Sequence, residues 1–235
     1  MGLNFKQRAD WLAHVLKAAV HQHHVELRGR FAPYIPEDGV VFDVGAHAGQ
    51  FAKLFAGLAP RGVVYAFEPS PYALSVLKPA LAFNRVRNVR IVPHGLSDTD
   101  GEAVLKTPIK SGGGMGFGVA HLGADDGSRP TVDAGVKLTT ADAFAAAEGL
   151  RRVHFIKADI EGWEAHMLRG AQGILVRDRP ALFLEVFPAS LARAGATPDD
   201  VWNLLTPLGY RAMRAPDFET VDRFAGEGDY LFVGS

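Results

Sequence analysis

The stretch Val40-Val-Phe-Asp-Val-Gly-Ala-His-Ala-Gly49 combines the local signals that decide the fold. Its first half is a β-branched and aromatic run that predicts a buried strand, and its glycines predict a tight turn. Apolar residues then recur every three or four positions over 51–58, which predicts a helix. Strand, glycine loop and helix form a cradle for a nucleotide-like ligand, because the loop amides and the helix N-terminus face whatever lies above the strand, and the missing Cβ atoms leave room for close approach.

The glycine spacing and the next strand narrow the class of ligand. Gly45 and Gly49 are separated by three residues, His47 among them, whereas the dinucleotide fingerprint requires G-x-G-x-x-G. A P-loop is excluded, because neither Lys-Ser nor Lys-Thr follows the second glycine. The next predicted strand ends in Glu68, whose carboxylate can accept hydrogen bonds from both hydroxyls of a ribose. With Asp43 just before the turn, the pattern favours an adenosine that carries no phosphates.

This loop and four later segments resemble the FkbM type of S-adenosylmethionine-dependent methyltransferases. The resemblance covers about residues 38–234, and the combination of segments is specific. The segments are 42–50 (FDVGAHAGQ), 66–71 (AFEPSP), 94–98 (HGLSD) with Gly101, 156–164 (IKADIEGWE) and 180–186 (PALFLEV). One departure is that the family usually has Asn where this chain has His47.

The expected fold is α/β, with a doubly wound, mostly parallel seven-stranded sheet and helices on both faces. By the resemblance it is of the Rossmann-like class I methyltransferase type, with a final antiparallel pair of strands and S-adenosylmethionine as the cofactor. The domain spans 38–235, and 1–37 form an N-terminal amphipathic helix and a linker. The resemblance also places Ser97 and Asp98 against the adenine, with a turn held by local hydrogen bonds as the alternative.

Three carboxylates are expected to carry the chemistry: Asp159, Glu161 and Glu185. Asp159 ends the predicted fourth strand at the ligand edge of the sheet, where it either faces the methyl group or caps the helix expected over 160–171. A hydroxyl is a weak acid, so methyl transfer needs a base or a hard cation. We rank a direct base above a divalent metal, because no all-oxygen ligand motif is legible.

Two charges fall on positions that should be buried. Lys157 lies inside the predicted fourth strand, and Glu164 lies in the middle of the apolar face of the expected helix. An unpaired buried charge is costly, so we expect Lys157, Glu164 and Glu185 to form one paired network. A purely structural ion pair is at least as good an explanation as a catalytic role for Lys157.

The segment 111–118 (SGGGMGFG) is too rich in glycine for regular structure and too long for a simple hairpin turn. Short β-like pieces flank it at 103–106 and 136–138. We favour a substrate lid, in which Met115, Phe117 and His121 contact the acceptor, over a disordered surface insertion.

The residues 3–25 have apolar positions at helical spacing, interspersed with charges, which predicts an amphipathic helix and argues against a secretory signal. The helix is expected to pack on the domain or on a second copy in a homo-oligomer. His21, His23 and His24 follow closely; they can bind metal, but a helix end also favours protonated side chains, which is the commoner case.

Composition limits the partners and the location. The 235 residues are 48% hydrophobic and carry a formal net charge of -1, so a nucleic-acid partner is not expected. There are no cysteines, which excludes disulfides and thiolate zinc sites, and no apolar run is long enough for a membrane span. We expect a cytoplasmic enzyme.

The expected activity is transfer of a methyl group from S-adenosylmethionine to a hydroxyl oxygen of a small molecule or sugar. The hydroxyl acceptor is implied by the resemblance, and a nitrogen acceptor is a variant of it. The alternatives from other classes are a dinucleotide-dependent oxidoreductase, which the missing middle glycine disfavours, and a non-catalytic adenosine-binding module.

Overall fold

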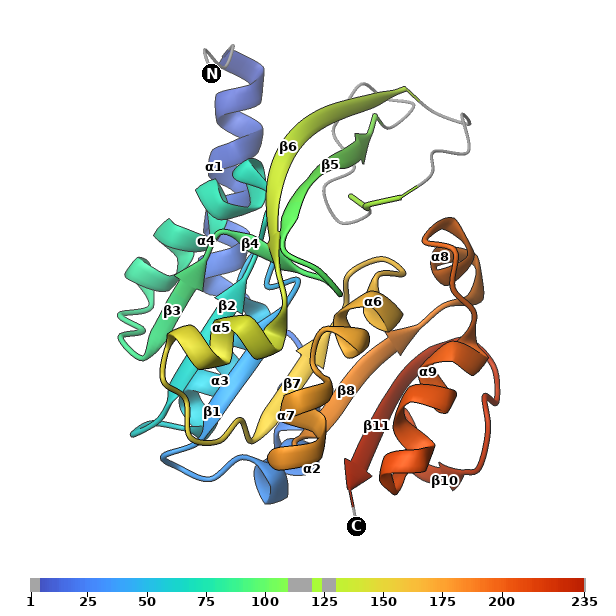
Figure 1. The fold of residues 1–235 in the computed structure, drawn as a ribbon. Helices are drawn as coiled ribbons and strands as arrows, with labels where there is room; N and C mark the ends of the chain where they lie inside the picture. The colour runs from blue at the N-terminus through green and yellow to red at the C-terminus, as the bar shows by residue number, and fades with distance from the viewer. Residues whose placement is uncertain (1–4, 110–119, 124–129, 235) are drawn as a thin grey trace.

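The computed structural model describes residues 5–109, 120–123 and 130–234, with side chains from residue 11 onward (Figure 1). It contains an eight-stranded sheet and a separate three-stranded sheet. In spatial order the strands of the large sheet are β10 (Glu219–Val221), β9 (Tyr210–Arg214), β11 (Gly228–Gly234), β8 (Ala181–Val186), β7 (Phe155–Ala158), β1 (Val40–Val44), β2 (Val63–Phe67) and β3 (Val89–Val92).

The strands β8, β7, β1, β2 and β3 run parallel, whereas β11, β9 and β10 each pair antiparallel with their neighbours. The mostly parallel sheet with an antiparallel end is therefore confirmed. The expected number of seven strands was one too few, because Glu219–Val221 adds an outer strand to β9. A three-residue edge strand of this kind has too few residues for a period-two pattern to stand out.

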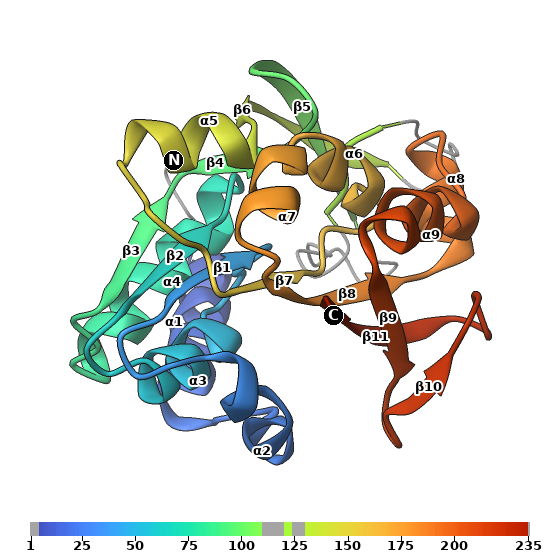
Figure 2. The ribbon, with the colours of Figure 1, turned by 60° about the horizontal axis from the view of Figure 1, so that its bottom comes forward.

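Helices cover both faces of the large sheet (Figure 2). The sheet separates two apolar clusters, because side chains alternate along each strand: Phe42 and Val44 face one cluster, and Val41 faces the other. The helices on the face of Phe42 are α5 (Ala141–Ala147), α6 (Glu164–Arg169), α7 (Gln172–Arg177) and α9 (Pro198–Leu205), with α8 (Pro188–Arg193) at the end of β8. Those on the other face are α2 (Arg28–Phe31), α3 (Gln50–Leu58) and α4 (Pro71–Phe83).

The N-terminal helix α1 (Phe5–Val20) ends before the expected residue 25 and lies along α4 (Figure 1). Val15 and Ala18 pack against Val76 and Ala80, and the indole nitrogen of Trp11 donates a hydrogen bond to Ser75 Oγ at 3.1 Å. The expectation that this helix packs on its own domain is confirmed for the described residues. Among those residues, none of the helices has the length and apolar content needed to cross a membrane.

The small sheet consists of β4 (His94–Leu96), β5 (Gly101–Pro108) and β6 (Thr131–Thr139). The strands β5 and β6 form an antiparallel hairpin that rises from one edge of the domain (Figure 1). Both are longer than the expected pieces, because each continues toward the glycine-rich segment. That segment lies outside the described residues, as do Met115 and Phe117 of the expected lid. His121 is described: its backbone exchanges two hydrogen bonds with Lys106 and so extends the small sheet.

Candidate active site

The loop between β1 and α3 turns sharply at two glycines with positive φ, 73° at Gly45 and 83° at Gly49. A Cβ built on Gly45 lies 2.0 Å from the backbone oxygen of Asp159, and one built on Gly49 lies 2.6 Å from a methyl carbon of Leu77. The glycines therefore allow the loop to pack against β7 and α4. This corrects the expectation that the missing Cβ atoms make room for a ligand.

Glu68 follows the end of β2 and joins two loops. Its Oε2 accepts the backbone N–H of His47 and its Oε1 accepts that of Ser70, both at 2.8 Å. Burial raises the pKa of this carboxyl to about 7, although the two N–H groups act in the opposite direction. Each carboxylate oxygen has two lone pairs, so Glu68 retains capacity to accept further hydrogen bonds from a ligand.

A cavity of about 310 Å³ lies above the carboxyl ends of β1, β2 and β7. Its volume is at the lower end of the range for small-molecule sites, about 300–1,000 Å³. The expected site residues that line it are Gly45, His47, Glu68, Asp159 and Glu161. Asp43 is buried in β1 and Gly49 is buried at the end of the loop, so neither lines the cavity, and Glu185, Ser97 and Asp98 also lie outside the lining.

The side chain of Lys157, on β7, contacts groups at the carboxyl ends of β1 and β7. Its Nζ donates hydrogen bonds to the carbonyl oxygens of Val44 (3.2 Å) and Gly45 (3.0 Å), and lies 3.7 Å from Asp43 Oδ1 and 3.8 Å from Asp159 Oδ2. Burial alone would lower the pKa of Lys157, but the two aspartates raise it.

The prediction that Lys157, Glu164 and Glu185 form one network was therefore wrong. The acids closest to Lys157 are Asp43 and Asp159. Lys157 lies opposite Asp43 in the register of β1 and β7, so Asp43 is its nearest buried acid. Burial raises the pKa of Asp43 to about 6, while Lys157 acts to lower it.

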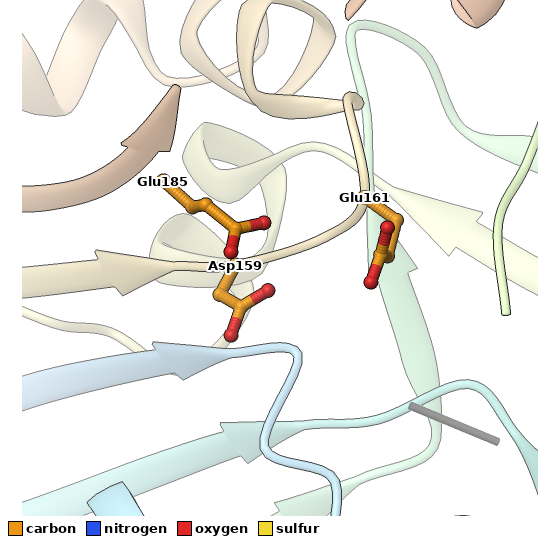
Figure 3. Close-up of side chains that lie close together, drawn as sticks. All are labelled: Asp159, Glu161 and Glu185. Carbon is orange, nitrogen blue, oxygen red and sulfur yellow. The ribbon is translucent and has the colours of Figure 1, made fainter. Parts of the chain in front are cut away.

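Asp159, Glu161 and Glu185 form an acid cluster (Figure 3), and the first two line the cavity. One carboxylate oxygen of each lies within 4.8 Å of the others. Asp159 follows β7, Glu185 lies on the neighbouring β8, and Glu161 comes from the loop after Asp159. Burial and the charge of Asp159 raise the pKa of Glu161 to about 7, and the same two effects raise that of Glu185 well above its usual range.

Asp229 is a fourth carboxylate near the acid cluster that sequence reasoning missed. It lies on β11 directly opposite Glu185, and burial together with Asp159 raises its pKa to about 6. No motif marks this position, because its proximity depends on the antiparallel return of the last strand.

The model of the FkbM methyltransferase domain matches residues 43–212 of this chain, a range that includes Glu68 and the whole acid cluster. The chain belongs to the FkbM methyltransferase family. The resemblance seen in the sequence is thereby confirmed. The helix α1 and the segment up to β1 precede the matched FkbM domain.

Three relatives of this FkbM protein share about a quarter of their aligned residues with it. Methyltransferase 1 of Beauveria bassiana is 26% identical over 59% of this chain and 60% of its own length. Hexuronic acid methyltransferase AglP of Haloferax volcanii is 26% identical over 72% of this chain and 62% of its own length. AMB antimetabolite synthetase AmbE of Pseudomonas aeruginosa is 25% identical over 85% of this chain but only 11% of its own length. The chain therefore spans only part of each relative.

Solved structures show the same fold. An FkbM methyltransferase from Methylobacillus flagellatus KT superposes with a TM-score of 0.53 at 15% identity, covering 85% of this chain and 44% of that one. A candidate methyltransferase from Streptococcus mutans in complex with SAH gives a TM-score of 0.51 at 13% identity, covering 91% of this chain and 97% of that one. At these identities the likeness concerns the fold alone.

In this FkbM domain, Ser97 and Asp98 belong to a network beside the cavity. Ser97 Oγ donates to Asp98 Oδ1 and accepts the indole N–H of Trp163, both at 3.0 Å. Asp98 Oδ2 lies 3.0 Å from His166 Nδ1, and the His166 ring stacks on Trp163 at 4.1 Å. These contacts hold Trp163 in the cavity wall, and contact of Ser97 and Asp98 with adenine stays a prediction.

The helix after β7 begins later than expected, at Glu164 and not at residue 160. Glu161 and Gly162 have φ values of 56° and 102°, which an α-helix does not allow. Asp159 is therefore not the cap of this helix. Glu164 is 1% exposed, and its Oε1 accepts the backbone N–H of Ile160 at 3.0 Å.

Glu164 is expected to make the protein less stable as the pH rises. Burial raises its pKa from 4.5 to about 7, so between these values the unfolded chain releases a proton that the folded chain retains. The stabilisation that Glu164 contributes is fully present below pH 4.5 and is lost as the pH rises through about 7. Glu164→Gln should remove a slope of about 1.4 kcal/mol per pH unit within that window.

Urea unfolding of both proteins at pH 5, 6 and 7 measures this slope. Glu219→Gln, which neutralises an exposed carboxylate, is the matched control and should leave it unchanged. Parallel curves for the wild type and Glu164→Gln would contradict the assignment.

Proposed function

We propose that this FkbM domain transfers a methyl group from S-adenosylmethionine to a hydroxyl oxygen of a small molecule or sugar. The observation that carries the proposal is a cavity whose lining includes Glu68 together with Asp159 and Glu161. The first carboxylate suits a ribose, and the others suit an acceptor hydroxyl. The printed name of the Haloferax relative, a hexuronic acid methyltransferase, supports a sugar acceptor.

The residues that line the cavity fit S-adenosylmethionine. Glu68 would accept hydrogen bonds from the ribose, Gly95 and Leu96 would lie along the adenine, and Gly45 and Ala46 would lie beneath the methionine part. S-adenosylmethionine supplies a methyl group on a sulfonium, which is already activated for transfer. The protein's tasks are to align the acceptor, exclude water and accept the hydroxyl proton.

Asp159 is the group we assign to accept the proton. Its side chain is 45% exposed, against 20% for Glu161, so an acceptor can reach it. Lys157 lies 3.8 Å from one of its oxygens and fixes the side chain at the end of β7. Arg193 Nη2 lies 3.5 Å from Glu161 Oε2 and balances part of the negative charge.

The test is methyl transfer from labelled S-adenosylmethionine to a panel of sugars, uronic acids and hydroxylated natural products. We expect label on an oxygen of at least one acceptor, identified by mass spectrometry and NMR of the product. Label on nitrogen would replace the oxygen assignment. Binding of S-adenosylmethionine with no transfer to the panel or to a metabolite extract would favour an adenosine-binding module.

The acid cluster also has the geometry of a divalent-cation site, which is the second candidate. Three oxygen ligands at this spacing suit Mg²⁺, which typically completes its shell with water. Because a direct base is favoured, we expect turnover to persist after treatment with EDTA and exchange into metal-free buffer. Loss of activity that Mg²⁺ restores would assign the acid cluster to a metal instead.

A further inference from the structure

The segment between α1 and the FkbM domain is fixed against the start of α3. We call residues 21–24 the N-terminal arm. Gln22 Nε2 donates to the carbonyl oxygen of Gln50 at 3.0 Å, and Gln50 Oε1 accepts the backbone N–H of His23 at 3.2 Å. Lys53 Nζ donates to the carbonyl oxygens of Ala18 at 2.6 Å and His21 at 3.2 Å. These hydrogen bonds hold the arm beside the glycine loop.

His24 is the residue of the N-terminal arm that lines the cavity. Its ring stacks on Phe51 with centroids 4.4 Å apart and an interplanar angle of 13°. Lys157 is a second neighbour of the Phe51 ring, with its Nζ 5.1 Å from the ring centroid. His24 has φ 63° and ψ 21°, a left-handed conformation that a non-glycine residue keeps only where its surroundings hold it.

The three histidines of this region do not gather into a metal site. The rings of His21 and His23 stack 6.2 Å apart and both residues are exposed, whereas His24 turns toward the cavity. Within the described residues, Asp159, Glu161 and Glu185 form the one group with metal-ligand geometry. His24 therefore has a different chemical setting from its two neighbours.

Burial lowers the pKa of His24 and outweighs the opposite effect of Glu26, whose Oε1 lies 4.0 Å from His24 Nδ1; the charge of Lys157 acts in the same direction as burial. The neutral imidazole has one N–H donor and one acceptor nitrogen. Lys157 Nζ already donates to two carbonyl oxygens and lies beside two carboxylates, so its charge is engaged by groups of the protein. At this end of the cavity, His24 is thus an available polar group with both hydrogen-bonding functions.

The position of His24 indicates which part of a ligand it meets. Glu68 defines the ribose end, and the acid cluster continues beyond the cavity to Glu185, which marks the acceptor side. His24 lies instead beside Gln50 and Phe51, at the helix that follows the glycine loop. The part of the donor left for this corner is its α-amino acid group, which carries an ammonium and a carboxylate.

We infer that His24 binds the α-amino acid group of S-adenosylmethionine, so the N-terminal arm, which precedes the FkbM domain, completes the donor site. The inference rests on the proposed use of this donor. His24 is a positioning residue, because it holds the donor by an end remote from the methyl group. The proton acceptor remains Asp159.

The test compares three ligands by calorimetry: S-adenosylmethionine, S-adenosylhomocysteine and methylthioadenosine, which lacks the amino acid group. His24→Ala should weaken binding of S-adenosylmethionine and S-adenosylhomocysteine about tenfold, because one hydrogen bond to a charged group is lost. It should change the affinity for methylthioadenosine less than twofold. His24→Gly should give the same pattern, because glycine accepts the positive φ without strain. His24→Gln, which keeps a donor and an acceptor, should recover most of the affinity.

His23→Ala is the matched control, since it removes an exposed histidine from the same arm and should leave all three affinities unchanged. Equal weakening of methylthioadenosine by His24→Ala and His24→Gly would show that the arm only supports the fold. Unchanged affinities with a raised acceptor KM would assign His24 to the acceptor. A wild-type protein that binds methylthioadenosine but neither larger ligand would overturn this inference, and one that binds none of the three would instead remove the proposed function.

Discussion

Asp159→Asn is expected to lower turnover about 100-fold or more while the fold and the affinity for S-adenosylmethionine are retained. The substitution keeps the size of the side chain but removes its ability to accept a proton. In the structure Asp159 lies at the end of β7, caps no helix and faces the cavity beside Glu161. The substitution Asp159→Asn should therefore affect methyl transfer more than it affects the packing of the fold.

Single-turnover kinetics and calorimetry on the same preparation separate the two effects for Asp159→Asn. Asp199→Asn, which neutralises an exposed carboxylate in the first turn of α9, is the control and should turn over like the wild type. Normal turnover by Asp159→Asn would mean that another member of the acid cluster takes the proton. The double variant with Glu161→Gln would then identify it.

Glu68→Ala is expected to weaken binding of S-adenosylmethionine at least tenfold, because hydrogen bonds from two ribose hydroxyls to a charged acceptor are lost. The structure adds a second consequence. The backbone N–H groups of His47 and Ser70 lose their acceptor, so the free energy of unfolding should fall by about 1–3 kcal/mol for each group left unsatisfied. Binding of methylthioadenosine should weaken as much as binding of S-adenosylmethionine, because both ligands contain the ribose.

Calorimetry with both ligands and urea unfolding of the unliganded protein measure these effects. Glu68→Gln keeps an oxygen acceptor for one of the two N–H groups, so its stability should lie between those of Glu68→Ala and the wild type. A folded Glu68→Ala protein with an unchanged dissociation constant would show that the ribose lies elsewhere.

The sequence by itself determined the core of the fold and several residues that line the cavity. Strand, turn and helix signals around Gly45 are local, and Glu68 and Asp159 were placed correctly because each directly follows a predicted strand. The carboxyl ends of parallel strands share one edge of a sheet, so residues that follow different strands meet there without further information. Asp159 lies near Glu185 for the same reason, because β7 and β8 are neighbouring parallel strands.

Only the tertiary structure decided which charges are partners. Lys157 pairs with Asp43 because β1 is the neighbour of β7, and spacing along the chain does not encode that neighbourhood. The late start of α6 depends on positive φ values at Glu161 and Gly162, where the loop packs tightly: a Cβ on Gly162 would lie 2.1 Å from the backbone oxygen of Ser190. His24 reaches the cavity because α1 lies along α4 and returns the arm to α3. Contacts between segments far apart in the chain depend on packing and strand order, whereas the sequence pattern reports only what each segment does locally.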